Sequence, residues 1–376
     1  MRIAIIGAGI AGLATGLGLQ RTGHEIIIYE KRSNAEAVGA GLTLFGNNFA
    51  ALDALEIRKI VESICSNDIA HMDSGQRTPS GKWLLKTPKA ATKSLHSVHR
   101  VTLHKALIKA LKAEIIEFNK NAVVSDATTA EISVNGTPIK FDLVVIADGI
   151  FSENRKQLIL DYGVRYSGYT AWRGVTSHPV NINNEVGETY GVGKRFGIVP
   201  IPDNKVYWYA TLGVPKNTKF ENNQKTLSKE FGDWHTPIKE CITATDSSNI
   251  LHHDIYDLKK LPKSLVKGKC VLIGDAAHAM TPDLGQGAGQ ALEDAATLVT
   301  LIANADVENL STYLDKYNQL RQPRVSKIWK QSRLTGQIFQ GTNPFIAKTR
   351  DLVFTLIPGK IMELTIKKLQ NWTTPH

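Results

Sequence analysis

Long apolar runs, clustered cysteines and a leader-like N-terminus are all missing from this 376-residue sequence. The longest apolar stretches, residues 143–147 and 352–358, fall well short of the ~20 residues that a membrane-spanning helix needs. The three cysteines, Cys65, Cys241 and Cys270, are far apart and form no CxxC pair, which argues against a disulfide framework and a structural metal. The N-terminal run passes straight into a glycine-rich turn, unlike a secretory signal. We therefore expect a cytoplasmic protein with no metal and no integral membrane span.

The sequence also has no acidic surplus. It contains 45 Lys and Arg and 35 Asp and Glu, which give a net charge of +10. From Ser311 to the C-terminus there are 11 basic and 3 acidic residues, so this segment carries most of the imbalance. A basic helical tail could touch nucleic acid or anionic lipid, but no nucleic-acid-binding motif accompanies it. We interpret the tail as a solvated face and expect no nucleic-acid partner.

The first thirty residues show a strand, a glycine turn, a helix and a second strand. Residues 2–6 are apolar and β-branched, a helical pattern follows the turn, and residues 25–29 form the next strand. In the turn, a GxGxxG match, Gly7 permits the tight bend, Gly9 lets a pyrophosphate approach the backbone, and Gly12 allows close helix packing. Glu30 ends the second strand, where it can accept hydrogen bonds from a ribose. The pattern predicts a dinucleotide site without separating FAD from NAD, with contacts from Gly7, Gly9, Ala11, Gly12 and Glu30.

A second motif, from Cys270 to Asp294, separates these two cofactors. It combines a strand, the turn Gly274-Asp275, and a glycine-rich loop before a helix whose N-terminus can stabilise the negative charge of a reduced flavin. This segment resembles the FAD motif of the class A flavoprotein monooxygenases, the para-hydroxybenzoate hydroxylase-like family. The resemblance implies FAD contacts from Asp275, Pro282, Gly285, Gln286, Gly287 and Ala288.

Further motifs extend the resemblance from residue 1 to about Arg324. The segment Ala147 to Arg155 is similar to a family motif that serves FAD and the nicotinamide donor, with Ile146 where the family usually has glycine. Glu30 to Arg32 and the loop Val38 to Gly41 resemble the segment that lies along the FAD. Other matches are the start of a helix at Arg100 and a loop in which Gly46 replaces the usual proline. The FAD contacts implied by these motifs are Lys31, Arg32, Gly41, Asn47, Arg100, Asp148 and Gly149.

The resemblance also implies a reaction. NADPH or NADH would reduce the bound FAD, O2 would add to it, and the flavin C4a-hydroperoxide would hydroxylate a small aromatic or heteroaromatic substrate. A second GxGxxG is absent, which argues against a separate NAD(P) domain. The sequence also contains no WxW pair, which argues against a flavin halogenase. Relatives that act on urate or tetracyclines, and a non-oxygenating flavin reductase, stay as alternatives. A monomer or homodimer with a small-molecule substrate is expected.

Three residues are candidates for catalysis or substrate binding. Asp283, in the flavin loop, is a candidate base, while Arg195 and Tyr207, on neighbouring predicted strands, could hold an anionic oxygen. These positions resemble the substrate residues of FAD-dependent urate hydroxylases. The alternative is a structural loop carboxylate and two residues of a sheet face. His278 is expected to be structural.

The fold expected from these motifs is α/β. A Rossmann-type FAD-binding domain, GR2-like and of the para-hydroxybenzoate hydroxylase fold, would carry an inserted, mainly antiparallel β-sheet substrate domain and C-terminal helices. The FAD-binding domain would comprise residues 1–74, 99–165 and 268–325, and the substrate domain residues 75–98 and 166–267. Residues 326–376 would form a helical segment with a break near Gly341 to Pro344.

Overall fold

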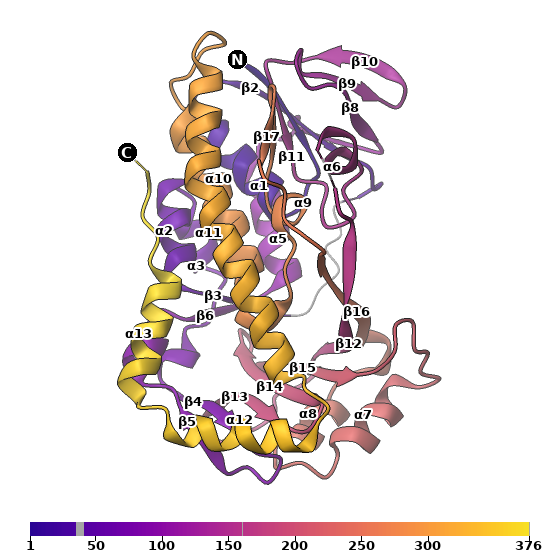
Figure 1. Ribbon diagram of the computed structural model, residues 1–376, viewed down its shortest axis with the longest axis vertical. Coiled ribbons are helices and arrows are strands. Elements are labelled where there is room, and N and C mark those ends of the chain that lie inside the picture. The colour runs from indigo at the N-terminus through magenta and orange to yellow at the C-terminus, as the bar shows by residue number, and fades with distance from the viewer. Residues whose placement is uncertain (35–40, 160, 376) are drawn as a thin grey trace.

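The computed structural model describes residues 1–34, 41–159 and 161–375. Two large sheets dominate it, at opposite ends of the molecule, and the long helix α11 (Leu310–Phe339) runs past both of them (Figure 1). This is the mixed α/β arrangement that the sequence predicts.

The six-stranded sheet has the order β17-β18-β11-β1-β2-β7 and is parallel except at the edge strand β17. Its central strands are continuous apolar runs because helices cover both faces of a parallel sheet. Helix α1 (Ile10–Leu19) packs against α5 (Arg100–Ala110) and α10 (Gly287–Ile302). The strands are β1 (Arg2–Ile6), β2 (Glu25–Glu30), β7 (Ile116–Phe118), β11 (Leu143–Ile146), β17 (Val266–Lys267) and β18 (Cys270–Leu272).

The seven-stranded sheet has the order β16-β12-β15-β14-β13-β4-β5 and is antiparallel except between β13 and β4. One face packs on helices α7 (Asn223–Phe231) and α8 (Ile238–Thr243) through an aromatic core that includes Trp172, Phe196 and Trp208. The other face is free of these helices and carries polar and aromatic side chains. The strands are β4 (Asp73–Arg77), β5 (Trp83–Lys86), β12 (Val164–Val175), β13 (Glu185–Tyr190), β14 (Lys194–Ile201), β15 (Lys205–Gly213) and β16 (Leu251–Leu258).

Smaller elements fill the space around the two sheets. Strands β3 (Gly41–Leu44) and β6 (His96–His99) form a pair, and β8 (Ala122–Asp126), β9 (Glu131–Val134) and β10 (Thr137–Lys140) form a three-stranded sheet. The short helices are α2 (Gly46–Ala54), α3 (Arg58–Glu62), α4 (Lys89–Thr92), α6 (Glu153–Leu158) and α9 (Asp275–His278). Single 3-10 turns are η1 (Asp68–Ala70), η2 (Ser247–Asn249) and η3 (Pro282–Leu284).

The C-terminal region is helical with one break, as predicted. Helix α11 ends at Phe339, and α12 (Pro344–Leu356) begins at a proline after Asn343, whose side chain accepts a hydrogen bond from the Phe345 amide. Helix α13 (Gly359–Gln370) follows. None of the helices within the described ranges combines the length and apolar character needed to cross a membrane. The division into two domains at the predicted boundaries stays a prediction.

Candidate active site

One large cavity, of about 1500 Å³, is lined from both large sheets and from the C-terminal helices. Its size exceeds the ~300–1000 Å³ of a pocket for one drug-sized ligand, so it can take a dinucleotide and a substrate together. Most of the predicted cofactor contacts line it. They are Gly7, Gly9, Ala11, Glu30, Lys31, Arg32, Gly41, Arg100, Asp148, Gly149, Asp275, Pro282, Gly285, Gly287 and Ala288.

Each glycine of the turn after β1 plays a different structural part. Gly7 has φ +109°, and an added Cβ would lie 2.5 Å from the Ala147 carbonyl oxygen. An added Cβ at Gly12 would lie 2.0 Å from the Gly7 oxygen, so only glycine lets α1 pack this closely on the turn. A Cβ at Gly9 would meet no atom within 4 Å. Gly7 and Gly12 therefore build the turn, whereas Gly9 leaves open space on the cavity wall.

Side chains from two other elements fix this turn. The Glu30 carboxylate accepts hydrogen bonds from the Ala8 amide (2.9 Å) and the Arg32 amide (3.0 Å). His104 Nε2 donates to the Ala8 carbonyl oxygen at 2.7 Å. Burial lowers the pKa of His104, with the backbone hydrogen bond acting against this shift. The imidazole is therefore neutral at pH 7 and serves the backbone rather than carrying charge.

The turn after β11 presents a carboxylate to the same cavity. Asp148 Oδ2 accepts from Asn154 Nδ2 at 3.0 Å, while Oδ1 is buried and has no partner within the described part of the chain. The next residue, Gly149, has φ +85° and open space beside it. Arg155 points elsewhere, since it donates to the carbonyl oxygens of Ala276 and Ile150 and joins this turn to α9.

These features of the cavity suit a bound FAD. Three glycines from three separate loops, Gly9, Gly149 and Gly287, have no atom within 4 Å of an added Cβ, which is the cradle that a cofactor lying against backbone requires. The buried, unpartnered Asp148 Oδ1 needs a hydrogen-bond donor, and the hydroxyl groups of the cofactor are donors of this kind. The α10 N-terminus at Gly287 adds its unpaired amides to the cavity wall.

The structure places three predicted cofactor contacts elsewhere. Gly12, Asn47 and Gln286 are not among the residues of the cavity wall. Asn47 Nδ2 instead donates to Gln286 Oε1 (3.0 Å) and to Glu293 Oε1 (2.7 Å) in a buried network behind the flavin loop. Their contact with FAD stays a prediction, as does that of every other residue named for it. The loop residues Val38 to Ala40 lie outside the described residues.

The buried network behind the loop is strongly charged. Arg321 donates to Glu293 (2.6 Å) and Asp294 (2.7 Å), Arg324 donates to Glu293 (2.5 Å), and His278 Nε2 lies 2.6 Å from Asp294. Burial alone would raise the pKa of Glu293, but the charges of the two arginines outweigh it and lower that pKa. The network connects α10 with α11, and His278 belongs to it as a structural residue.

Two of the three catalytic candidates meet on the seven-stranded sheet. Arg195 Nη2 lies 2.6 Å from Asp283 Oδ1, and their side chains are 2% and 0% exposed. Tyr169 donates its hydroxyl proton to Asp283 Oδ2 at 3.0 Å. Burial opposes the charged form of Arg195, but Glu188 and Asp283 outweigh it and raise the pKa of its guanidinium. Arg195 is therefore a permanent buried cation on the cavity wall.

Sequence reasoning missed two partners of Arg195. Glu188 Oε1 lies 3.6 Å from Arg195 Nη1, and its two oxygens accept the hydroxyl protons of Tyr209 (2.6 Å) and Tyr190 (2.5 Å). Gln340 Oε1 accepts from Arg195 Nε at 3.2 Å. The alternation of strand residues is the one signal that could have found Glu188 and Tyr209, because both lie on cavity-facing positions. The position of Gln340, just after α11, has no such signal.

The third candidate, Tyr207, lies apart from this pair. In the register of β14 and β15, Tyr207 is opposite Val199, whereas Arg195 is opposite Thr211. Four residues of strand place them on the order of 13 Å apart along the same face. The Tyr207 ring packs against Gly41, and burial raises the pKa of its hydroxyl, with the charge of Arg173 acting against this shift. Tyr207 therefore lines a different part of the cavity.

The cavity has one more wall, which sequence reasoning did not foresee. Apolar side chains of α12 and α13 face into it, joined by Phe339 at the end of α11. Arg350 fixes α12 in place, because its guanidinium reaches the Gly191 and Phe339 carbonyl oxygens and pairs with Asp351 at 2.7 Å. The apolar wall consists of Val353, Phe354, Leu356, Ile357, Ile361, Met362, Ile366 and Leu369.

A parallel sheet with this glycine turn, an inserted antiparallel sheet and one cavity between them define a flavoprotein of the para-hydroxybenzoate hydroxylase type. The family model described as "FAD binding domain" matches residues 1–332. The aurachin C monooxygenase/isomerase of Stigmatella aurantiaca is 31% identical, over 99% of this chain and 98% of its own length. The 2-heptyl-3-hydroxy-4(1H)-quinolone synthase of Pseudomonas aeruginosa is 32% identical, over 96% and 95%. The chain therefore belongs to the FAD binding domain family, among its class A monooxygenases.

A solved structure agrees on the fold. Klebsiella pneumoniae HpxO, complexed with FAD and uric acid, superposes with a TM-score of 0.89 at 22% identity, covering 98% of this chain and 96% of that one. FAD is thus the cofactor of the family to which the chain belongs, and the fold is the one that the sequence predicts.

Proposed function

We propose that the protein uses bound FAD, NADH or NADPH, and O2 to hydroxylate a nitrogen heteroaromatic ring that carries an apolar chain. The observation that carries this proposal is one cavity that joins the FAD-binding turns, the buried polar cluster around Arg195 and the apolar wall of α12 and α13. When bound, FAD would relay electrons from NADH or NADPH to O2 and supply the activated oxygen that forms. The residues of the chain hold the ring, exclude water and manage its proton.

The names of two relatives support a substrate of this kind. One is a monooxygenase/isomerase named for aurachin C, and the other makes 2-heptyl-3-hydroxy-4(1H)-quinolone, in which a hydroxyl group lies beside a heptyl chain on a nitrogen heterocycle. In this chain, the apolar wall offers a place for such a chain, since burying each methylene is worth about 0.8 kcal/mol. Urate lacks a substituent that would use that wall.

Arg195 is the group that would orient the ring. Its charge is fixed by Asp283 and Glu188, and its side chain is on the cavity wall while shielded from bulk water. A ring oxygen that becomes negatively charged when the substrate loses its proton, before the adjacent ring carbon attacks the electrophilic oxygen, would be held by this cation. A charge-assisted hydrogen bond of this kind is worth about 1.5–3 kcal/mol.

The same cluster can take up the substrate proton. One guanidinium, Arg195, faces two carboxylates, Asp283 and Glu188, so the three groups carry one surplus negative charge when all are ionised. A proton removed from a ring N–H or hydroxyl neutralises that surplus and leaves the ring richer in electrons. Both Asp283 oxygens are already engaged by Arg195 and Tyr169, so we propose that Asp283 positions Arg195. The Tyr209 hydroxyl lines the cavity and would take up the substrate proton as it passes its own proton to Glu188 Oε1.

The test is oxidation of NADH and NADPH by the FAD-loaded protein, with O2 uptake and product mass recorded. The panel comprises 2-heptyl-4(1H)-quinolone, salicylate and urate. We expect the quinolone to accelerate oxidation and gain one oxygen atom. Arg195→Met should keep FAD and lose about 10- to 100-fold in kcat/KM. Tyr169→Phe, the matched control, removes one neutral hydroxyl and should lose less than about 10-fold. Reduction of FAD without oxygenation of any compound would contradict the proposal.

A further inference from the structure

Helices α12 and α13 expose an unusual number of apolar side chains. Of the fourteen large apolar residues exposed within the described chain, seven lie in these two helices, with Phe345 77% exposed. Together the two helices line one corner of the molecule (Figure 1). We call the exposed face of residues 344–370 the C-terminal surface. Its apolar members are Phe345, Ile346, Leu352, Val353, Leu356, Ile361 and Leu364. Clustered exposure of this kind marks an interaction surface rather than a random surface.

The C-terminal surface is also basic. Residues 344–370 contain five basic and two acidic residues. Both acidic residues are engaged, because Asp351 pairs with the buried Arg350 (2.7 Å) and Glu363 pairs with Lys367 (2.5 Å). The three remaining lysines, Lys348, Lys360 and Lys368, are exposed and form no ion pair with any described residue. Lysines beside exposed Phe and Leu are the composition of helices that lie in a membrane interface.

The cavity opens at this same surface. Val353, Leu356 and Ile361 line the cavity, yet Leu356 is 71% and Ile361 56% exposed. Deeper along the same helices, Phe354, Met362 and Ile366 line the cavity and are less exposed. Apolar side chains of α12 and α13 therefore belong both to the C-terminal surface and to the cavity that the FAD-binding turns line.

We propose that the C-terminal surface docks on an anionic phospholipid bilayer and admits an apolar substrate from it into the cavity. The lysines face the lipid phosphates while the apolar side chains enter the acyl boundary. A second copy of this chain fits less well, because two such surfaces would bring like charges together. The entry of substrate rests on the proposed function, whereas the docking does not.

The test measures binding of the FAD-loaded protein to sedimented vesicles of phosphatidylglycerol, with phosphatidylcholine vesicles beside them. We expect binding to phosphatidylglycerol that weakens as salt is added, since exposed charges are screened. Two variants divide the surface. Phe345→Ser, Leu352→Ser and Leu364→Ser together remove exposed apolar groups that do not line the cavity, and Lys348→Glu, Lys360→Glu and Lys368→Glu together reverse the charge. Each triple variant should lose roughly tenfold or more in vesicle affinity.

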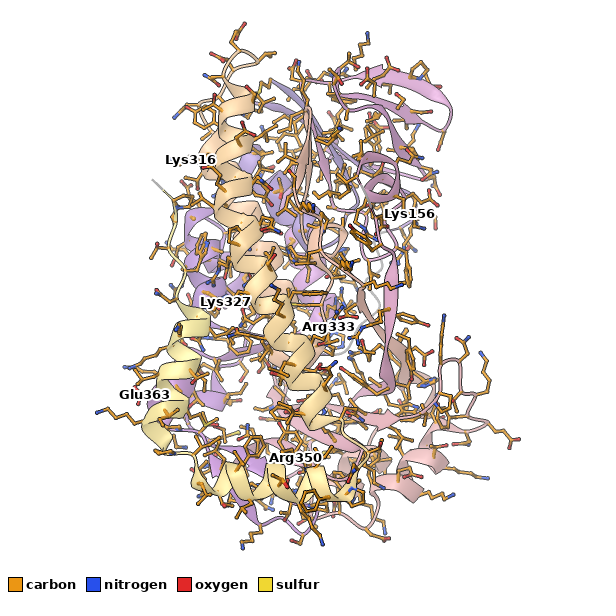
Figure 2. All side chains as sticks on the ribbon, in the orientation of Figure 1. Lys156, Lys316, Lys327, Arg333, Arg350 and Glu363 are labelled. Carbon is orange, nitrogen blue, oxygen red and sulfur yellow. The ribbon has the colours of Figure 1, made fainter. Side chains whose placement is uncertain are left out.

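Matched controls make the same changes elsewhere. Val307→Ser, Leu320→Ser and Leu334→Ser together remove three exposed apolar groups outside α12 and α13. Lys109→Glu, Lys156→Glu and Lys239→Glu reverse the same amount of charge, and Lys156 lies across the molecule from Glu363 of α13 (Figure 2). Both controls should bind vesicles like the wild type. Thermal unfolding and the flavin absorbance of every variant verify that it is folded.

Three outcomes would overturn the proposal. They are no sedimentation of the wild type at low salt, equal loss in the controls, and a dimer that buries the C-terminal surface and does not bind vesicles. Sedimentation velocity of the wild type and the serine variant detects the dimer. Vesicle binding is measured without substrate, so its failure is distinct from a failure to hydroxylate. For entry, quinolone supplied in vesicles should be turned over at least about tenfold faster by the wild type than by the lysine variant, with equal rates on dispersed substrate.

Discussion

Replacing Gly9 by alanine distinguishes the contribution of the glycine turn to stability from its contribution to FAD binding. Gly9 has φ −76° and ψ −179°, which alanine adopts freely, and an added Cβ meets nothing within 4 Å. At this N-cap position alanine is disfavoured, but a glycine-to-alanine change also restricts the unfolded chain, and the two effects have opposite sign. The free energy of unfolding of the apoprotein should therefore change by less than about 1 kcal/mol.

Binding of FAD to the Gly9→Ala variant should be much weaker. The added methyl group lies on the cavity wall, in the space where we expect the FAD pyrophosphate to approach the backbone. A loss of at least about tenfold in affinity, or ~1.4 kcal/mol, is expected. The matched variant is Gly12→Ala, in which the Cβ would lie 2.0 Å from the Gly7 oxygen. Because α1 must shift, this variant should lose about 1–3 kcal/mol of stability even without FAD.

Two measurements on the same samples decide the matter. Urea unfolding of the apoprotein, followed by circular dichroism, gives the stability, and quenching of flavin fluorescence gives the affinity for FAD. Wild-type affinity in Gly9→Ala would refute the reasoning. The reasoning would also be refuted if the apoprotein lost as much stability in Gly9→Ala as in Gly12→Ala.

Two further predictions concern buried charge. Arg321→Met leaves Glu293 and Asp294 buried with one cation fewer and should lower the free energy of unfolding in urea by about 3 kcal/mol, whereas a loss below ~1 kcal/mol would contradict it. Burial lowers the folded pKa of His104 below 6.5, so the unfolded chain binds its proton first and stability should fall as pH drops through 6.5. His104→Gln keeps a donor for the Ala8 carbonyl oxygen, and its free energy of unfolding should fall less than that of the wild type between about pH 7 and 5. An equal fall in the two proteins would refute the contribution assigned to His104. Four other histidines share this direction of shift and supply the remainder.

The strands of the FAD sheet could be predicted because their signal is local. Residues 2–6, 143–147 and 270–273 are short apolar runs that end at glycine turns, and the structure has strands at Arg2–Ile6, Leu143–Ile146 and Cys270–Leu272. A strand buried on both faces must be apolar along its whole length, so its sequence alone identifies it.

The polar cluster could be predicted only in part, because its members come from distant segments. Asp283 and Arg195 were candidates from their motifs, and the fold brings them to 2.6 Å. Gln340 joins Arg195 from 145 residues away, and no local pattern fixes such a contact. Asn47, which the motif resemblance predicts at the flavin, donates to Glu293, and its contact with FAD stays a prediction. Side-chain direction depends on packing that sequence spacing does not encode.

The wall formed by α12 and α13 has a consequence for the order in which the protein is made. Every cavity residue contributed by the FAD-binding turns and the flavin loop lies before residue 292, whereas the apolar wall lies at 353–369. A chain leaving the ribosome therefore completes its nucleotide-binding surface well before its substrate-binding surface, and domains fold as they emerge. Arg324 donates to the Leu369 and Asn371 carbonyl oxygens and so fastens the last helix to Glu293. During synthesis, FAD can thus bind before α12 and α13 complete the wall of the cavity.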